Sequence, residues 1–278
     1  MNYRECYEKG KNMLLESGVP EPELDARFLL EFICRTDRNT LLVHGDREVT
    51  EPEQSAYEAL LEKRCTRIPL QHLTGMQNFM GLDFLVNEHV LIPRQDTEIL
   101  VEEVLKNLHD GMRVLDLCTG SGCILISLLH YTNGCSGVGA DISGEALAVA
   151  GKNAMRLLGE QRLNFVQGDL FENISGQFEI IVSNPPYIER QVIPELMPEV
   201  REHEPLAALD GGVDGLDFYR KIVAESPRYL CGGGMLFFEI GYNQGEAVKQ
   251  LMMRTGFHEV CVLQDYAGLD RVVYGTWF

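Results

Sequence analysis

The sequence lacks any apolar run long enough to cross a membrane. Its longest apolar segments, such as residues 123–129, fall well short of the roughly 18 residues that a spanning helix requires. The N-terminus carries charges throughout and lacks the uninterrupted apolar core of a secretory signal. We therefore expect neither an integral membrane protein nor an exported one, and we place the chain in the cytoplasm.

Positive charge and paired cysteines are also scarce. The 278 residues carry 24 Lys and Arg against 42 Asp and Glu, so the formal net charge is −18. This acidity repels phosphate backbones, and no concentrated basic patch offsets it, so nucleic acid is disfavoured as a partner. The eight cysteines include no C-x-x-C pair, which argues against a zinc site and a disulfide framework. We expect reduced thiols and no bound metal.

What remains is an ordinary globular composition, with 45% hydrophobic and 24% charged residues and enough length for about two domains. Apolar residues recur at three- and four-residue spacings up to about residue 70, and prolines punctuate them. This pattern predicts a small helical domain over residues 1–72. Residues 73–92 place β-favouring side chains around two glycines, which predicts a β-hairpin linker.

From residue 93 onward strand-like and helix-like segments alternate. Apolar runs such as RVLDLC, GVGADI and FEIIVSN are bounded by turns, and most are separated by segments with helical spacing. Such runs are typical of a parallel sheet that helices cover on both faces. We therefore predict a doubly wound α/β domain over residues 93–278.

The first candidate site is VLDLCTGSG at residues 114–122, a predicted strand that runs into a glycine turn and then a helix. Gly120 and Gly122 would let the backbone approach a ligand at the helix N-terminus, where free N–H groups attract carboxylates and phosphates. A tight turn without a ligand is the alternative. The dinucleotide fingerprint needs a small residue at position 125, where Leu125 stands, and this disfavours NAD.

Acidic residues stand at the ends of the next two predicted strands. Asp141 ends GVGAD, where its carboxylate could accept both ribose hydroxyls of a nucleoside. Its alternative role is to cap the following helix, although Ser143 could do so instead. Asp169 ends the third strand, where it could accept from an adenine amino group. Ligands of open α/β sheets bind outside the carboxyl ends of the strands, so we expect an adenosine-containing cofactor there.

The most informative stretch is Asn184-Pro185-Pro186-Tyr187, at the end of the fourth predicted strand. Prolines fix φ and push the preceding residue into an extended conformation, so the Asn184 side chain and the Pro185 carbonyl can be two rigid acceptors. The Tyr187 ring could pack on a planar amide or base and lie near a sulfonium methyl by cation–π attraction. A turn that merely closes a strand would explain neither Asn184 nor Tyr187.

The NPPY motif behind a D-x-x-T-G-S-G loop resembles the class I S-adenosylmethionine-dependent methyltransferases that act on planar conjugated nitrogens. More narrowly, nearly the whole chain is similar to the PrmC/HemK family. The segments that carry the likeness are IPRQDTE (92–98), DLCTGSG (116–122), NPPYI (184–188), EPLAAL with DGGVDGLDFYR (204–220), FFEIGYNQG (237–245) and DYAGLDRVVYG (265–275). One departure is Cys118, where the general methyltransferase loop has glycine.

The resemblance implies a Rossmann-like, mostly parallel seven-stranded sheet and the cofactor S-adenosyl-L-methionine, with S-adenosyl-L-homocysteine as product. It implies methylation of the side-chain amide nitrogen (N5) of the glutamine in the GGQ motif of peptide chain release factors, which tunes translation termination. The helical domain and residues 204–220 would grip this protein substrate. The implied cofactor-binding residues are Cys118, Thr119, Gly120, Ser121, Gly122, Asp141, Asp169, Leu170 and Asn184.

The resemblance also assigns roles at the substrate side. Asn184 through Tyr187 would bind the substrate, and Asn184, Pro185 and Tyr187 would be catalytic. An amide nitrogen is a poor nucleophile, so two acceptors would have to hold its N–H groups and turn it toward the methyl group. Arg94 and Thr97 would close the cofactor pocket, although Arg94 could equally be a structural salt-bridge residue. Glu239 would tie loops together without a catalytic role.

Two other functions stay open. An adenine-N6 methyltransferase of DNA or RNA could use the same NPPY geometry on a flipped base, although the net charge of the chain opposes it. A catalytically silent cofactor-binding module is the second alternative, but such a module has no need of two rigid acceptors at the mouth of its crevice.

Overall fold

The chain forms two compact units in a computed structural model that describes residues 1–159 and 162–278. The first unit contains Met1–Met76 and also Met197–His203, and the described parts of Gln77–Leu196 and Glu204–Phe278 form the second. The chain therefore contributes twice to its first unit. The domain boundaries expected at 72/73 and 92/93 stay a prediction.

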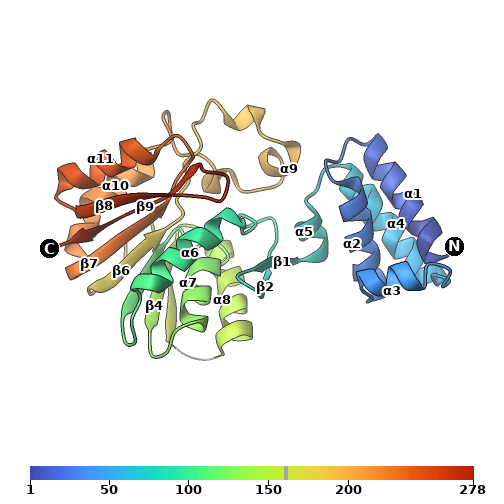
Figure 1. The fold of residues 1–278 in the computed structure, drawn as a ribbon, viewed down its shortest axis with the longest axis horizontal. Helices are drawn as coiled ribbons and strands as arrows, with labels where there is room; N and C mark the ends of the chain where they lie inside the picture. The colour runs from blue at the N-terminus through green and yellow to red at the C-terminus, as the bar shows by residue number, and fades with distance from the viewer. Residues whose placement is uncertain (160–161) are drawn as a thin grey trace. The chain divides into compact units, whose positions relative to one another are not determined.

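The first unit is helical, as the periodicity predicts, with short helices around one core (Figure 1). Two of its helices begin with capping boxes, formed by Asn2 with Glu5 and by Thr50 with Glu53, which satisfy N–H groups that a helix start leaves free. The Tyr57 hydroxyl donates to the Ala26 carbonyl at 3.1 Å inside the core. The helices of this unit are α1 (Tyr3–Glu16), α2 (Pro22–Cys34), α3 (Arg38–Val43), α4 (Glu51–Cys65), α5 (Leu70–Thr74) and α9 (Pro198–Arg201).

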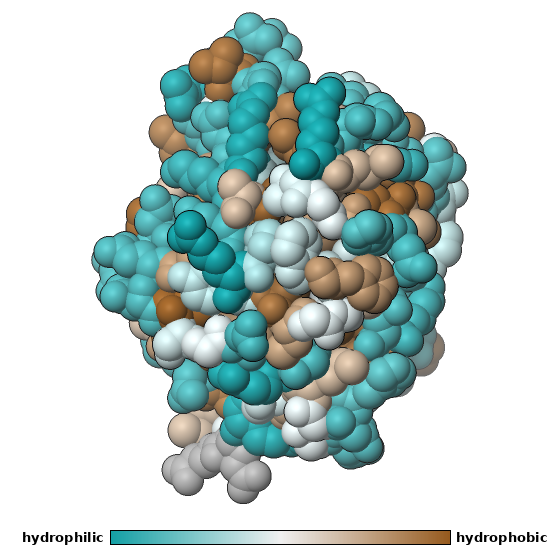
Figure 2. All heavy atoms as spheres, turned by 90° about the vertical axis from the view of Figure 1, so that its left-hand side faces the viewer, coloured by the Kyte–Doolittle hydropathy of each residue, from teal (hydrophilic) through white to brown (hydrophobic). Residues whose placement is uncertain are grey.

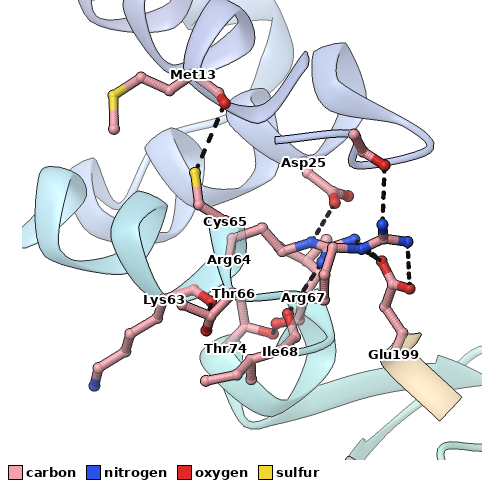
Figure 3. A network of polar contacts seen from close by, with 12 residues as sticks. Met13, Asp25, Lys63, Arg64, Cys65, Thr66, Arg67, Ile68, Thr74 and Glu199 are labelled. Atoms are coloured by element: carbon pink, nitrogen blue, oxygen red, sulfur yellow. Dashed lines mark hydrogen bonds and ion pairs between the residues drawn. The ribbon is translucent and has the colours of Figure 1, made fainter. Parts of the chain in front are cut away.

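A buried ionic cluster fastens α9 to the other helices of the first unit (Figure 3). Arg64 donates to Asp25 at 2.7 Å and to Glu199 at 2.9 Å. Arg67 donates twice to Glu199, at 2.7 and 2.6 Å. Two cations face two anions, so the charges balance, as buried charges require. Glu199 is the member of this cluster that comes from the returning segment.

A hairpin with the strands β1 (Met76–Phe79) and β2 (Leu82–Leu85) lies at the boundary between the two units along the chain, with all but Met76 in the second unit. Phe79 and Phe84 are fully buried in the same hydrophobic cluster as residues of the main sheet and its helices. The buried side chain of Asn153 bonds both backbone groups of Leu85, accepting at 2.7 Å and donating at 3.0 Å. The hairpin is thus packed into the core of the second unit.

A seven-stranded sheet with the order β5-β4-β3-β6-β7-β9-β8 forms the centre of the second unit. Within this sheet β9 is antiparallel to both of its neighbours, and the other neighbouring pairs are parallel. The predicted mostly parallel, doubly wound sheet is therefore confirmed. Its strands are β3 (Arg113–Leu117), β4 (Ser136–Asp141), β5 (Leu163–Gln167), β6 (Phe178–Ser183), β7 (Leu230–Glu239), β8 (His258–Gln264) and β9 (Asp270–Trp277).

Helices cover both faces of this sheet, and each face has its own hydrophobic cluster. One cluster joins α6 and α7 to the sheet, and the other joins α10 and α11 to its opposite face (Figure 1). The helices of the unit are α6 (Asp96–Asn107), α7 (Cys123–His130), α8 (Gly144–Leu158), α10 (Asp217–Glu225) and α11 (Gly245–Thr255), with 3-10 turns at Ile193–Glu195, Leu206–Ala208 and Ser226–Arg228.

The surface of the face shown in Figure 2 is largely hydrophilic, and its hydrophobic residues are scattered in small groups. Among the described residues, every helix is too short or too polar to cross a membrane.

Candidate functional site

The candidate site lies where the order of the sheet reverses. The chain goes from β3 to β4 on one side, and later places β6 on the other side of β3. The loops after β3 and β6 therefore meet at the carboxyl edge of the sheet, which is where open α/β sheets bind ligands. A cavity of about 510 Å³ opens at this edge, within the usual range for small-molecule sites.

The cavity brings together most of the residues that the sequence nominates. Arg94, Thr97, Cys118, Thr119, Gly120, Ser121, Asp141, Asp169, Leu170, Asn184 and Pro186 line it. Gly122, Pro185 and Tyr187 are not among its lining residues. All of these residues belong to the second unit.

The loop after β3 has left-handed backbone at several positions. Cys118 has φ of +59°, so the cysteine at the place of the usual glycine adopts the conformation that glycine would allow. Gly120 also has a positive φ of +55°, and a Cβ there would meet no atom within 4 Å. At Gly122 a Cβ would come within 2.8 Å of Ile126 Cδ1 and 3.2 Å of Ala150 Cβ. Gly120 therefore faces open space, whereas Gly122 allows α7 and α8 to pack closely.

The buried side chain of Asp116 supports the loop after β3. Asp116 is fully buried in β3, and its Oδ2 accepts from the Thr119 hydroxyl at 2.6 Å. Burial raises the pKa of Asp116 to about 7, although the hydrogen bond from Thr119 opposes this. Asp116 does not line the cavity, so it does not contact a ligand there. Its role is to hold Thr119 and thereby to shape the loop.

Asp141 links the ends of β3 and β4. Its Oδ2 accepts from the Gly120 N–H and its Oδ1 from the Ser143 N–H, both at 2.9 Å. Burial raises the pKa of Asp141, and these backbone hydrogen bonds oppose the rise. The helix cap is Ser143, whose hydroxyl accepts from the Ala146 N–H at 3.1 Å. Asp141 is thus free of the capping role and presents a fixed carboxylate at the cavity wall.

The loop after β5 supplies the adjoining wall. Asp169 is exposed, and its carboxylate lies 3.8 Å from the ammonium of Lys221, which also lines the cavity. Leu170 is buried and has a positive φ of +53°. A leucine in this conformation is uncommon, and it turns the chain sharply at the strand end. The two residues therefore give this wall one charged and one apolar group.

Arg94 combines the two roles that the sequence leaves open. It lines the cavity, and its guanidinium forms an ion pair of 2.6 Å with Glu204. The same Glu204 carboxylate accepts from the Ile92 N–H at 3.1 Å. Glu204 is almost fully buried, so it holds both the arginine and the backbone before it.

Asn184 also lines the cavity, and the nitrogen of its side-chain amide is already hydrogen-bonded. Its Nδ2 donates to the Thr97 hydroxyl at 3.3 Å. Among the described residues, none donates a hydrogen bond to Asn184 Oδ1 or to the Pro185 carbonyl. Both oxygens that the sequence nominates as acceptors therefore keep their capacity to accept.

Tyr187 is held by three partners behind this turn. Its hydroxyl donates to Glu239 Oε1 at 3.3 Å, and its carbonyl accepts from Gln244 Nε2 at 3.0 Å. A Cβ at Gly211 would come within 2.7 Å of the Tyr187 Cα, so the glycine-rich loop packs directly against it. Burial raises the pKa of the Tyr187 hydroxyl, and the nearby Glu239 charge adds to the rise. The tyrosine is thus part of the framework that fixes the turn.

Several lining residues lie outside the predicted set. Residues 205–208 belong to the segment that we expected to grip a protein substrate, yet they form part of the cavity wall. Ile142, next to Asp141, is an exposed apolar side chain at a strand end, which is a signal that the sequence offered. The remaining lining residues not predicted are His89, Val90, Leu91, Pro93, Cys123, Ile124, Ala140, Ser143, Ala146, Gly168, Asp210, Phe218 and Lys221.

The chain matches known families in both of its parts. Residues 5–75 match the family model "PrmC N-terminal domain", and residues 94–200 match "Methyltransferase small domain". The fold is similar to a crystal structure of a methyltransferase from Pyrococcus furiosus, with a TM-score of 0.53, 18% sequence identity, and coverage of 71% of this chain and 90% of that one. Together with the strand order, this shows that the second unit has the fold of the class I methyltransferases.

Relatives that align over nearly the whole chain show to which family it belongs. A release factor glutamine methyltransferase of Geobacter sulfurreducens is 45% identical over 266 residues, covering 95% of this chain and 93% of the relative. One of Caulobacter vibrioides is 41% identical over 269 residues, covering 96% and 93%. The chain belongs to the release factor glutamine methyltransferase family.

Proposed function

We propose that the protein transfers a methyl group from S-adenosyl-L-methionine to N5 of the glutamine in the GGQ motif of peptide chain release factors. The observation that carries the proposal is the Asn184 amide. It lies on the wall of the cavity, and its oxygen accepts no hydrogen bond from the described residues. A relative that is 45% identical to this chain is named a release factor glutamine methyltransferase, which supports the proposal.

The residues at the cavity fit the cofactor. Asp141 offers an acceptor for ribose hydroxyls, and Gly120 leaves open space beside it. Ile142, Leu206 and Phe218 supply apolar surface for an adenine ring. S-adenosylmethionine supplies an activated sulfonium methyl group when it is bound. We assign Cys118 through Ser121 to its methionine end, and Asp169 with Leu170 to the border of the adenine.

At the substrate side Asn184 and Pro185 orient the acceptor amide. An amide nitrogen shares its lone pair with its carbonyl and is a poor nucleophile. If Asn184 Oδ1 and the Pro185 carbonyl each accept one N–H, the nitrogen is held with its face toward the methyl group and can become pyramidal as the bond forms. Neither oxygen is a strong base, so their role is orientation. The proton becomes acidic only after methyl transfer.

In this proposal the segments of the chain have different roles. Residues 1–72 recognise the protein substrate, residues 73–92 form the linker, and residues 93–278 carry the methyltransferase domain. A lone glutamine offers little binding surface, so contacts remote from it supply much of the positioning energy. We place the reaction in the cytoplasm, and we propose no direct nucleic-acid binding because a net charge of −18 repels phosphate backbones.

Mass spectrometry of a purified bacterial release factor, incubated with the enzyme and S-adenosylmethionine, tests the proposal. We expect an added mass of one methyl group on the glutamine of the GGQ loop. A parallel reaction with duplex DNA and single-stranded RNA uses tritiated cofactor. Label in nucleic acid, with an unmodified release factor, would establish the adenine-N6 alternative instead. Bound cofactor without label in any substrate would indicate a silent binding module.

A further inference from the structure

Behind the cavity wall a chain of polar side chains runs from Asn184 to Glu239. Asn184 Nδ2 donates to Thr97 Oγ1 at 3.3 Å. Thr97 is only 2% exposed, and it lies in the first turn of α6. Its hydroxyl oxygen accepts from Asn184, so its single proton remains to be donated elsewhere. A threonine hydroxyl can donate or accept, and by itself it does not choose between the two ends of an asparagine amide.

Glu239 is the group that determines whether the Thr97 hydroxyl donates or accepts toward Asn184. It ends β7, it is 2% exposed, and its Oε2 is buried without a hydrogen bond of regular geometry from the described residues. Its Oε1 already accepts from the Tyr187 hydroxyl at 3.3 Å. Burial raises the pKa of Glu239, whereas a hydrogen bond from Thr97, the charge of Arg271 and the hydroxyl of Tyr187 oppose the rise. Oε2 has no other partner and Thr97 is a hydrogen-bonding neighbour of this carboxyl group, so Oε2 is the acceptor available for the proton of Thr97.

From this geometry we infer that Glu239, acting through Thr97, is a positioning residue that fixes the polarity of the Asn184 amide. The carboxylate accepts from Thr97, Thr97 accepts from Asn184 Nδ2, and Asn184 Oδ1 is left facing the substrate. In the reversed orientation Asn184 would present its NH₂ group to the NH₂ group of the substrate glutamine. Two donors cannot bond each other, so the reversed amide would not hold the acceptor nitrogen. This inference rests on the proposed function.

Three variants distinguish a role of Thr97 in orienting the Asn184 amide from a role in maintaining the fold. Thr97→Val keeps the shape and removes the hydroxyl, so the amide can turn either way. We expect kcat to fall on the order of 10-fold, as for one lost hydrogen bond of orientation, while the dissociation constant for S-adenosylmethionine stays within about 2-fold. Thr97→Ser retains the hydroxyl and recovers most of kcat. Thr255→Val, at a part-buried threonine of α11 outside the cavity, is the matched control.

Glu239→Gln tests the origin of the polarity. Glutamine can donate to Thr97 and reverse the chain, so kcat falls in this variant. The effect acts through Thr97, so Glu239→Gln adds less to the loss in a Thr97→Val background than in the wild type. Melting curves and cofactor calorimetry of every variant establish that it is folded.

The outcomes distinguish this inference from the proposed function. Wild-type protein that fails to methylate a release factor removes the proposed function itself. Active wild type with an unchanged kcat in Thr97→Val, or with additive losses in the double variant, overturns the positioning role. Cofactor affinity that falls in step with kcat in Thr97→Val overturns it as well, because Thr97 would then act on the cofactor pocket.

Discussion

Glu199 and Arg67 form a two-fold hydrogen-bonded ion pair at 2.7 and 2.6 Å, although they are 132 positions apart in the sequence. Arg64 donates to the same carboxylate at 2.9 Å and connects it to Asp25. The side chain of Glu199 is 9% exposed. This buried pairing, drawn in Figure 3, is the polar anchor of the segment that returns to the helical unit.

Glu199→Ala is expected to destabilise the protein strongly. The change leaves Arg64 and Arg67 with one buried anion, and breaking a buried pair in this way costs about 3–5 kcal/mol. Chemical denaturation monitored by circular dichroism measures the loss. Glu202→Ala is the control, because Glu202 is exposed and pairs with Arg201 at the surface, where an ion pair contributes little to stability. Equal losses in the two variants would contradict the assignment.

The same cluster predicts a dependence of stability on pH. Burial by itself would raise the pKa of Glu199, but hydrogen bonds from Arg67 and Arg64 lower it to about 2. The folded pKa lies below the usual value, so the contribution is complete at neutral pH and disappears as pH falls from about 4.5 towards 2. Unfolding free energies measured across this range in wild type and in Glu199→Gln give the comparison. A wild-type curve parallel to that of the variant would exclude the linkage.

Asn184→Ala is expected to remove turnover and spare cofactor binding. Loss of one preorganised polar contact to the reacting group lowers kcat on the order of 10²–10³-fold. Steady-state kinetics with a release factor and calorimetry with S-adenosylmethionine measure the two effects separately. Asn164→Ala, at an exposed position of β5, serves as the control. Cofactor affinity that decreased together with turnover would assign Asn184 to the cofactor.

Asp141→Ala is expected to do the reverse. The variant loses a charge-assisted acceptor, and cofactor binding weakens by roughly 1.5–3 kcal/mol. It also leaves the Gly120 and Ser143 N–H groups without their acceptor, which loosens the loop. Calorimetry with S-adenosylmethionine gives the dissociation constant, and Asp110→Ala at an exposed turn controls for the loss of charge. An unchanged constant would place Asp141 outside the site.

The sequence predicts the sheet because each strand is a short apolar run, and most of the candidate residues meet at one cavity because they stand where such runs end. Carboxyl ends of parallel strands share one edge, so Cys118, Asp141, Asp169 and Asn184 could be brought together without any tertiary information. The pattern also places the helical N-terminal region correctly, since apolar periodicity and prolines are local features.

What the sequence leaves out depends on contacts between distant segments. Nothing near Glu199 indicates that Arg64 and Arg67 are its partners. Residues 205–208 line the cavity because Glu204, just before them, holds Arg94 and the Ile92 backbone. The positive φ of Cys118 could not be expected from a cysteine, which rarely adopts that conformation.

The returning segment Met197–His203 has a consequence for dissecting the protein. A cut between Met76 and Gln77 does not release two intact units, because α9 belongs to the first unit but would remain in the C-terminal fragment. The helical fragment would retain Arg64 and Arg67 with Asp25 as the surviving counter-ion of the cluster, while the other fragment would carry α9 without its ion-pair partners Arg64 and Arg67. Adding a peptide of residues 197–203 to the helical fragment is therefore the way to restore its charge balance.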